Sequence, residues 1–333
     1  MHIPDGYLSP QTCAVLGAAM VPVWATAASR AKRVVKNRYA PLMAVGAAYS
    51  FMVMMFNVPI PDGTTAHAIG GVLIAVLLGR WAAVISVSTA LAIQALFFGD
   101  GGVLAYGANC FNMAFVMPMV GYAVYRLVAG RVALTAPRRA VAAGLGGYVG
   151  LNAAALCAAV EFGVQPVLFH RADGTPLYAP FHLAQTIPAM LLAHLTVAGA
   201  VELALTAGVI AYLQRANVPL LRINHRGLPD RDDGAAVARS GRRVRGIAIG
   251  LAAMVVLTPV GLLARGTAFG EGKRGGSWRH ALLDGYGVPG VRDHSIGYLA
   301  AAVVGVALIG AVVFAITAVA RVGRRRARVG AGA

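Results

Sequence analysis

The sequence predicts an all-α integral membrane protein that crosses the bilayer several times. Hydrophobic residues make up 58% of the 333 positions and charged residues only 12%, with a mean hydropathy of +0.70. Soluble globular chains are closer to about half apolar and about a quarter charged. Here, long apolar runs are separated by short basic segments, which is the pattern of a polytopic membrane protein. The composition excludes a large soluble enzyme and a disordered chain.

Nine apolar runs are candidates for membrane-spanning helices. A spanning helix needs about 20 residues, because each residue rises ~1.5 Å and the hydrocarbon core is ~30 Å thick. The third run is short, so we expect part of it to be buried among the other helices. The first run has no basic residues before it, unlike a cleavable signal peptide. The runs cover about 9–29, 41–58, 64–79, 81–98, 104–125, 140–163, 186–213, 246–264 and 295–320.

The basic residues are distributed unevenly between the connecting segments. The connections after the first, third, fifth and seventh runs, together with the C-terminal segment, contain 23 of the 29 Lys and Arg residues. By the positive-inside rule these segments face the cytoplasm, which places the N-terminus outside and the C-terminus inside. For these connecting segments to lie on the same side of the membrane, one helix must end and the next must begin at Arg80. The formal charge of +17 is therefore a topology signal and a contact for anionic membrane lipid, and we expect no nucleic-acid partner.

Composition divides the chain into three parts. Residues 1–213 contain seven of the runs and form the predicted seven-helix body. Residues 214–245 are rich in Arg, Asp and Gly and have no apolar period, so we expect a basic cytoplasmic linker. Residues 246–333 form a predicted two-helix hairpin with an outside loop at 265–294. The three cysteines, Cys13, Cys110 and Cys157, lie in apolar runs without metal-ligand spacing and are expected to be small buried residues.

The N-terminal sequence MHIPDGYLSP contains a candidate metal chelate. The terminal amine of Met1, the amide nitrogen of His2 and the His2 imidazole can bind one metal ion in two fused rings that share a plane. Planar nitrogen donors favour Ni(II) or Cu(II), and Co(II) binds them less strongly. His67, in the outside loop FNVPIPDGTTAHAIGG, is the candidate fourth donor. Either histidine alone would be an ordinary terminal or helix-capping residue, but their shared side of the membrane and their two Pro-Asp-Gly turns favour a site.

Other polar residues have two interpretations each. Asp100 lies in a glycine-rich turn, and Asn109 and Asn112 follow one helical turn apart. They either form the turn and bind neighbouring helices or hydrogen bond to the metal ligands. His194 and Glu202 are eight residues apart, roughly on one helix face. They either hydrogen bond within the bundle or carry a functional signal to the inside.

Missing motifs narrow the function. The sequence has no GxxxxGK[ST] phosphate-binding loop, so we expect that this chain does not itself hydrolyse ATP. It has no HExxH or GxSxG motif, which speaks against an intramembrane hydrolase. A secondary transporter is often built from inverted repeats and has charged residues near the membrane midplane. The sequence shows neither feature, which speaks against that class. A metal-uptake component is favoured, and a stand-alone channel or secondary transporter and a membrane enzyme remain the alternatives.

Four segments in order resemble one known family. The start MHIPDGYLSP, VPIPDGTTAHAIGG near 58–71, the LFFGDGG, GAN and NMA elements at 96–114, and the AHL, AG, E, T and Y positions at 193–212 are similar to the CbiM/NikM family. These proteins are the substrate-binding membrane components of cobalt and nickel energy-coupling-factor transporters. The resemblance covers residues 1 to about 215. The tail at 246–333 resembles the small two-helix accessory component, CbiN/NikN, here fused to the body.

The resemblance implies a fold, a cargo and partners. It implies a seven-helix body with the N-terminal segment tucked into the bundle, and a metal held by Met1, His2 and His67. It implies a prokaryotic plasma-membrane protein with no cofactor beyond transported Co(II) or Ni(II). Its partners would be a transmembrane coupling subunit and two cytoplasmic ATPase subunits. Asp62 departs from the family pattern, and we expect it either to attract cations near the site or to be a turn variant.

Overall fold

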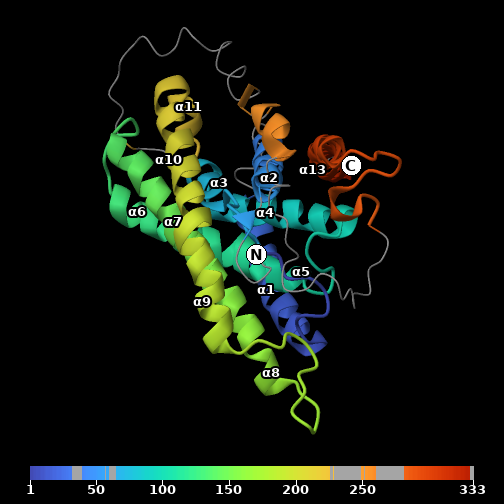
Figure 1. Ribbon diagram of the computed structural model, residues 1–333. Coiled ribbons are helices and arrows are strands. Elements are labelled where there is room, and N and C mark those ends of the chain that lie inside the picture. The colour runs from blue at the N-terminus through green and yellow to red at the C-terminus, as the bar shows by residue number, and fades with distance from the viewer. Residues whose placement is uncertain are drawn as a thin grey trace.

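The computed structural model describes residues 1–31, 40–56, 58–59, 65–225, 228, 249–250, 252–259 and 281–330. These residues form a bundle of helices with one very short antiparallel sheet (Figure 1). The elements in chain order are α1 (Pro10–Ala31), α2 (Ala40–Met54), β1 (Val58–Pro59), β2 (Thr65–Ala66), α3 (Gly71–Leu78), α4 (Arg80–Ile93), η1 (Gln94–Phe98), α5 (Tyr106–Asn109), η2 (Cys110–Val116), α6 (Met117–Ala129), α7 (Pro137–Gly163), α8 (Gln165–Leu168), α9 (Leu183–Ala193), η3 (His194–Ala198), α10 (Gly199–Ala216), α11 (Val218–Leu221), η6 (Asp284–Tyr286) and α13 (His294–Gly330).

Several helices are long enough to cross a bilayer, so the chain is a multi-pass membrane protein, as the sequence predicts. Within the described residues six continuous helical stretches have the necessary length and apolar character. They are Pro10–Ala31, Arg80–Phe98, Tyr106–Ala129, Pro137–Leu168, Leu183–Ala216 and His294–Ala315. Helix α2 is apolar but shorter. The predicted sidedness of the termini stays a prediction.

The third apolar run differs most from its expected form. A helix was expected over 64–79, but Thr65–Ala66 pairs with Val58–Pro59 as a strand and the helix begins only at Gly71. The resulting α3 has eight residues, about 12 Å at ~1.5 Å per residue, so it is too short to span the membrane. All of its residues except Leu77 are buried. The expectation that this run lies partly inside the bundle is confirmed.

The predicted break at Arg80 is present. Gly79 has a φ of 95°, a conformation that glycine adopts at little cost, and α4 begins at the next residue. The run at 41–58 ends earlier than expected, at Met54, and the final run extends further, with α13 continuing to Gly330. Of the predicted span at 246–264, only residues 249–250 and 252–259 are described. Asp62 lies outside the described residues.

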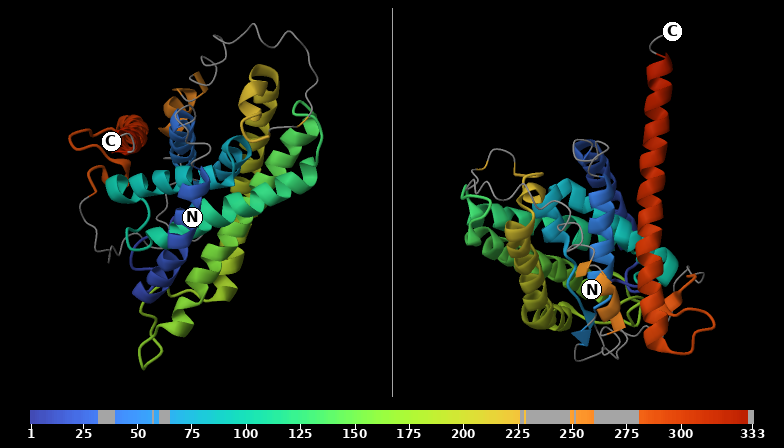
Figure 2. Two further views of the ribbon diagram at one scale, coloured as in Figure 1. Left: turned by 180° about the vertical axis from the view of Figure 1, so that it is seen from behind. Right: turned by 90° about the horizontal axis from the view of Figure 1, so that it is seen from above.

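The N-terminus lies inside the fold, and the C-terminal part of the chain contacts the bundle through α13 and the loop before it. The N-terminal residues lie at the centre of the bundle in all views (Figures 1 and 2), and Ile3 is fully buried. Helix α13 packs along α2 and extends well past the other helices (Figure 2). Its Tyr298 hydroxyl donates to the Met55 carbonyl at 2.7 Å, and the preceding loop donates from Leu283 N–H to the Phe97 carbonyl at 2.8 Å.

Residues after α11 hold the far end of α3. The Asn224 side-chain amide donates to the carbonyls of Ala75 and Val76, each at 3.1 Å, and to the Tyr122 hydroxyl at 3.1 Å. The last carbonyls of a helix have no partners within the helix. Asn224 therefore caps α3 at the end opposite His67.

Candidate metal site

The N-terminal segment is fixed between the helices by α5 and by the turn that precedes it. Asn109 donates to the Ile3 carbonyl at 3.0 Å and accepts from the Ile3 N–H at 2.8 Å, so one side chain holds both backbone groups of that residue. The Asp5 carboxylate accepts from the backbone N–H groups of Val103, Leu104 and Ala105. These bonds hold the first residues of the chain at a defined depth in the bundle.

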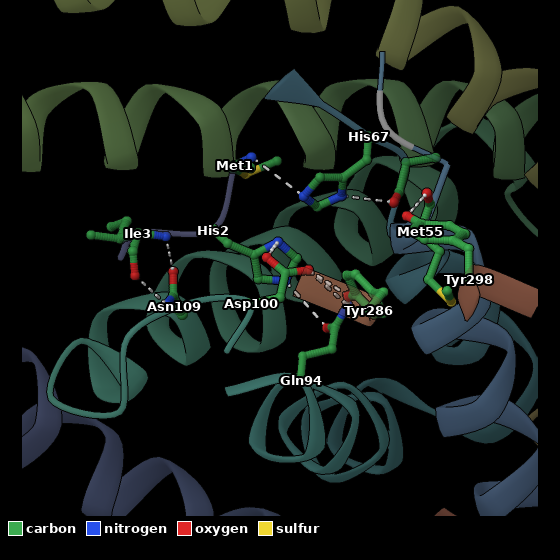
Figure 3. Close-up of polar contacts among 11 residues, drawn as sticks. Met1, His2, Ile3, Met55, His67, Gln94, Asp100, Asn109, Tyr286 and Tyr298 are labelled. Carbon is green, nitrogen blue, oxygen red and sulfur yellow. Dashed lines mark hydrogen bonds and ion pairs between the residues drawn. The ribbon is translucent and has the colours of Figure 1, made fainter. Parts of the chain in front are cut away.

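The structure brings Met1, His2 and His67 together (Figure 3). The Met1 amine lies 3.3 Å from Nε2 of His67, and the His2 and His67 rings stack with centroids 4.8 Å apart. Nδ1 of His67 lies 3.1 Å from the Ala68 carbonyl, which only accepts, so Nδ1 carries the proton. Nε2 of His67 therefore presents a lone pair toward the Met1 amine.

The spacing of these nitrogens matches adjacent corners of a planar site. With metal–nitrogen bonds of about 2.0 Å, two donors at a right angle lie about 2.8 Å apart. The observed 3.3 Å between the Met1 amine and His67 Nε2 is close to this value. His2 would close its chelate ring through Nδ1, which is joined to the carbon nearest the backbone. Nδ1 lies 3.4 Å from Asp100 Oδ1, and Nε2 lies 3.2 Å from Gln94 Oε1.

Burial favours the uncharged form of both histidines. Desolvation lowers the pKa of His67 well below its usual value, and the positive terminal amine and His2 lower it further. Desolvation also lowers the pKa of His2, while the Asp100 charge opposes that shift. A neutral imidazole has a lone pair that can bind a metal ion, whereas imidazolium has none. Burial thus favours, in both rings, the form that a metal site would require.

Glu202 supports the loop that carries His67. Its Oε2 accepts from the backbone N–H groups of Ile69 at 2.8 Å and Gly70 at 2.9 Å, and its Oε1 accepts from the Thr206 hydroxyl at 3.2 Å. Gly70 has a φ of 72°. The carboxylate lies at the N-terminal end of α3, where negative charge is favourable. This residue, expected on one face with His194, holds the backbone that follows His67.

The other predicted residues divide between the site and its surroundings. His194 is fully buried, with Nδ1 2.7 Å from the Met190 carbonyl and Nε2 without a hydrogen-bond partner among the described residues. Asn112 donates to Glu161 at 2.8 Å and joins η2 to α7 instead of contacting the donors. Three segments of wider, π-type helix, which often occur at functional sites, contain Gln94, Asn112 and His194.

Two residues around His2 were not predicted. Gln94 contacts Nε2 of His2, and Tyr286, from the C-terminal part, contacts both Gln94 and Asp100. Gln94 is the single carboxamide in the fourth apolar run, which was a usable signal. Tyr286 lies in a Gly-rich loop and had none. Burial raises the pKa of Tyr286, so its hydroxyl keeps its proton.

The donor set depends on backbone nitrogens. Within the described part of the chain, no group of three or more His, Cys, Asp or Glu side chains is arranged to hold a metal ion. The candidate arrangement of Met1, His2 and His67 needs no such group, since the amine and the His2 amide would supply two of its four nitrogens. A planar nitrogen set of this kind suits Ni(II), Cu(II) or Co(II) better than Mg or Ca.

The fold and the site together define a multi-pass membrane protein with a nitrogen-rich candidate metal site at its buried N-terminus. The chain belongs to the CbiM family, described as the cobalt uptake substrate-specific transmembrane region, which matches residues 2–220. This confirms the resemblance stated from the sequence.

Relatives with similar sequences extend into the tail. The fused nickel transport protein NikMN of Rhodobacter capsulatus is 56% identical over 271 residues, covering 81% of this chain and 75% of that protein. The putative fused nickel transport protein NikMN of Archaeoglobus fulgidus is 32% identical and covers 96% of this chain and 99% of that protein. A crystal structure of a truncated transition metal transporter is 59% identical with a TM-score of 0.62, covering 65% of this chain and 99% of that chain.

Proposed function

We propose that this chain binds Ni(II) or Co(II) outside the membrane and passes the ion inward as the substrate-binding component of an ATP-driven energy-coupling-factor transporter. The observation that carries the proposal is the 3.3 Å separation between the Met1 amine and His67 Nε2, beside the His2 ring and inside the bundle. The metal ion is the cargo, and we propose no resident cofactor.

Ni(II) is the favoured cargo. The planar nitrogen set binds Ni(II) more strongly than Co(II) in the general order of divalent metals. Two relatives with 56% and 47% identity are described as a fused nickel transport protein and a probable one. The family description names cobalt, and the same donors accept Co(II) with lower affinity.

Transport against a gradient would require partner subunits. The sequence has no phosphate-binding loop, so ATP hydrolysis is assigned to two cytoplasmic ATPases that act through a transmembrane coupling subunit. The purified chain reconstituted alone in liposomes, with ATP inside or outside, should bind nickel without accumulating it. Vigorous accumulation driven by an ion gradient alone would instead support a secondary transporter.

The binding site is tested by metal analysis and calorimetry of the chain carrying a C-terminal tag. The wild-type protein should bind about one Ni(II), and His67→Ala should weaken binding by more than ~100-fold, because even residues behind the ligands contribute ~10–100-fold. His170→Ala is the matched control, since His170 lies in an exposed loop and contacts the Arg171 carbonyl. Wild-type affinity in His67→Ala would remove that residue from the site.

A further inference from the structure

The C-terminal part of the chain reaches the surroundings of the candidate metal site through one side chain. Tyr286, in η6, lies among the aromatic rings of the body, with its ring 5.1 Å from that of Phe98 and 6.4 Å from that of Phe51. Its hydroxyl donates to Asp100 Oδ2 at 2.5 Å and accepts from Gln94 Nε2 at 3.0 Å. Figure 3 shows Tyr286, Gln94 and Asp100 beside His2.

Gln94 and Asp100, which hydrogen bond to the Tyr286 hydroxyl, also contact the two ring nitrogens of His2. Gln94 Oε1 lies 3.2 Å from His2 Nε2, and Asp100 Oδ1 lies 3.4 Å from His2 Nδ1. Each partner therefore has one atom toward the ring and another toward the tyrosine hydroxyl. Tyr286 can therefore influence the His2 ring through the orientation and hydrogen bonding of Gln94 and Asp100, without touching the ring itself.

The His2 tautomer decides whether this residue can chelate a metal. Neutral imidazole has one N–H and one lone pair. The chelate ring closes through Nδ1, so the competent tautomer has its proton on Nε2. The other tautomer places a proton on the nitrogen that must bind the metal.

Tyr286 favours the competent tautomer in two ways. Because its oxygen accepts from Gln94 Nε2, the amide is oriented with its acceptor oxygen toward His2, where it can accept a proton from Nε2. Because its proton goes to Asp100, the carboxylate competes less strongly for a proton on His2 Nδ1. The 3.4 Å Nδ1 contact is longer than the about 2.7–2.9 Å of a strong charge-assisted hydrogen bond.

We propose that Tyr286 is a positioning residue for the metal site, and that its hydroxyl orients Gln94 and Asp100 so that His2 presents Nδ1 to the ion. The site on the body is then completed by the fused C-terminal part. Without the hydroxyl, Gln94 Nε2 keeps only its long 3.5 Å contact with Asp100 Oδ2. The amide can then turn its NH2 group toward His2 and stabilise the tautomer that cannot chelate. This inference rests on the proposed metal-binding function and adds a residue that regulates the same site.

The test compares two hydroxyl deletions in the same part of the full chain. Tyr286→Phe keeps the ring and its packing, and Tyr298→Phe removes a hydroxyl that donates to the Met55 carbonyl. Ni(II) calorimetry on metal-stripped protein should show about tenfold or greater loss of affinity for Tyr286→Phe, by comparison with other groups that orient metal ligands. Tyr298→Phe should stay within about twofold of wild type.

Nitrogen NMR of the metal-free protein with ¹⁵N-labelled histidine separates positioning from general loosening of the fold. The His2 signals are identified by their absence in His2→Gln. In wild type, the His2 proton should reside on Nε2, and in Tyr286→Phe a substantial fraction should move to Nδ1. Unchanged affinity or an unchanged tautomer in Tyr286→Phe overturns the inference. Absence of metal binding by the wild-type chain overturns the proposed function instead.

Discussion

Adding one residue before Met1 should abolish high-affinity metal binding. The extension converts the terminal amine into an amide and moves the new amine outward by about 3.5 Å, the length of one extended residue. The present amine lies 3.3 Å from His67 Nε2. Two nitrogens bound to one metal through bonds of about 2.0 Å can be at most about 4 Å apart. An extended chain would therefore place the amine beyond reach of a metal bound to His67.

The expected loss of affinity exceeds ~100-fold, because the change removes a direct donor, and groups behind the donors already contribute ~10–100-fold. The extension also has to fit where Met1 is only 4% exposed and Ile3 is fully buried. Isothermal calorimetry with Ni(II) measures the effect, and the same extension at the C-terminus is the control. Equal affinities of the N-terminally extended and unextended proteins would refute the proposed donor set.

Two further substitutions test the support of the His67 loop. Glu202→Ala leaves the buried N–H groups of Ile69 and Gly70 without their acceptor, at about 1–3 kcal/mol each, so it should lower both thermal stability and Ni(II) affinity; unchanged affinity would show that the loop needs no such anchor. Gly70→Ala places a Cβ against the Tyr49 ring at a positive φ and should destabilise the protein by more than the ~1–2 kcal/mol cost of that conformation, measured by thermal unfolding. Gly208→Ala, where a Cβ meets nothing within 4 Å, is the control for Gly70→Ala. Equal melting temperatures for these two glycine-to-alanine variants would contradict the steric argument.

Much of the fold follows from local sequence properties. The length of an apolar run predicts a spanning helix because the membrane thickness sets that length, and most runs correspond to helices. The predicted start of the third helix was wrong because Thr65–Ala66 pairs with a strand formed by preceding residues and Gly70 adopts a positive φ. Hydropathy does not contain that information. The π-type segments within spanning helices likewise left no pattern in the apolar runs.

The candidate site was predictable only where its donors are close in sequence or share a loop motif. Met1 and His2 are neighbours, so their chelate geometry follows from covalent structure. His67 was suggested by its compact loop, and its role as a donor stays a prediction. The contact between Gln94 and Tyr286 joins residues 192 positions apart, and only tertiary packing brings them together. The spacing of residues in the sequence could not identify that pair.

The attachment of α3 at both ends has a mechanical consequence. Glu202 holds the backbone just before this helix, and Asn224 holds its last carbonyls. A buried helix of eight residues is too short to bend appreciably, so we expect it to shift as one rigid body. Ala75 and Asn224 are 149 positions apart in sequence, yet displacement of the His67 loop along the helix axis would displace Asn224 by the same amount. We therefore expect the loop that carries His67 and the residues that follow α11 to move together, as a single mechanical part.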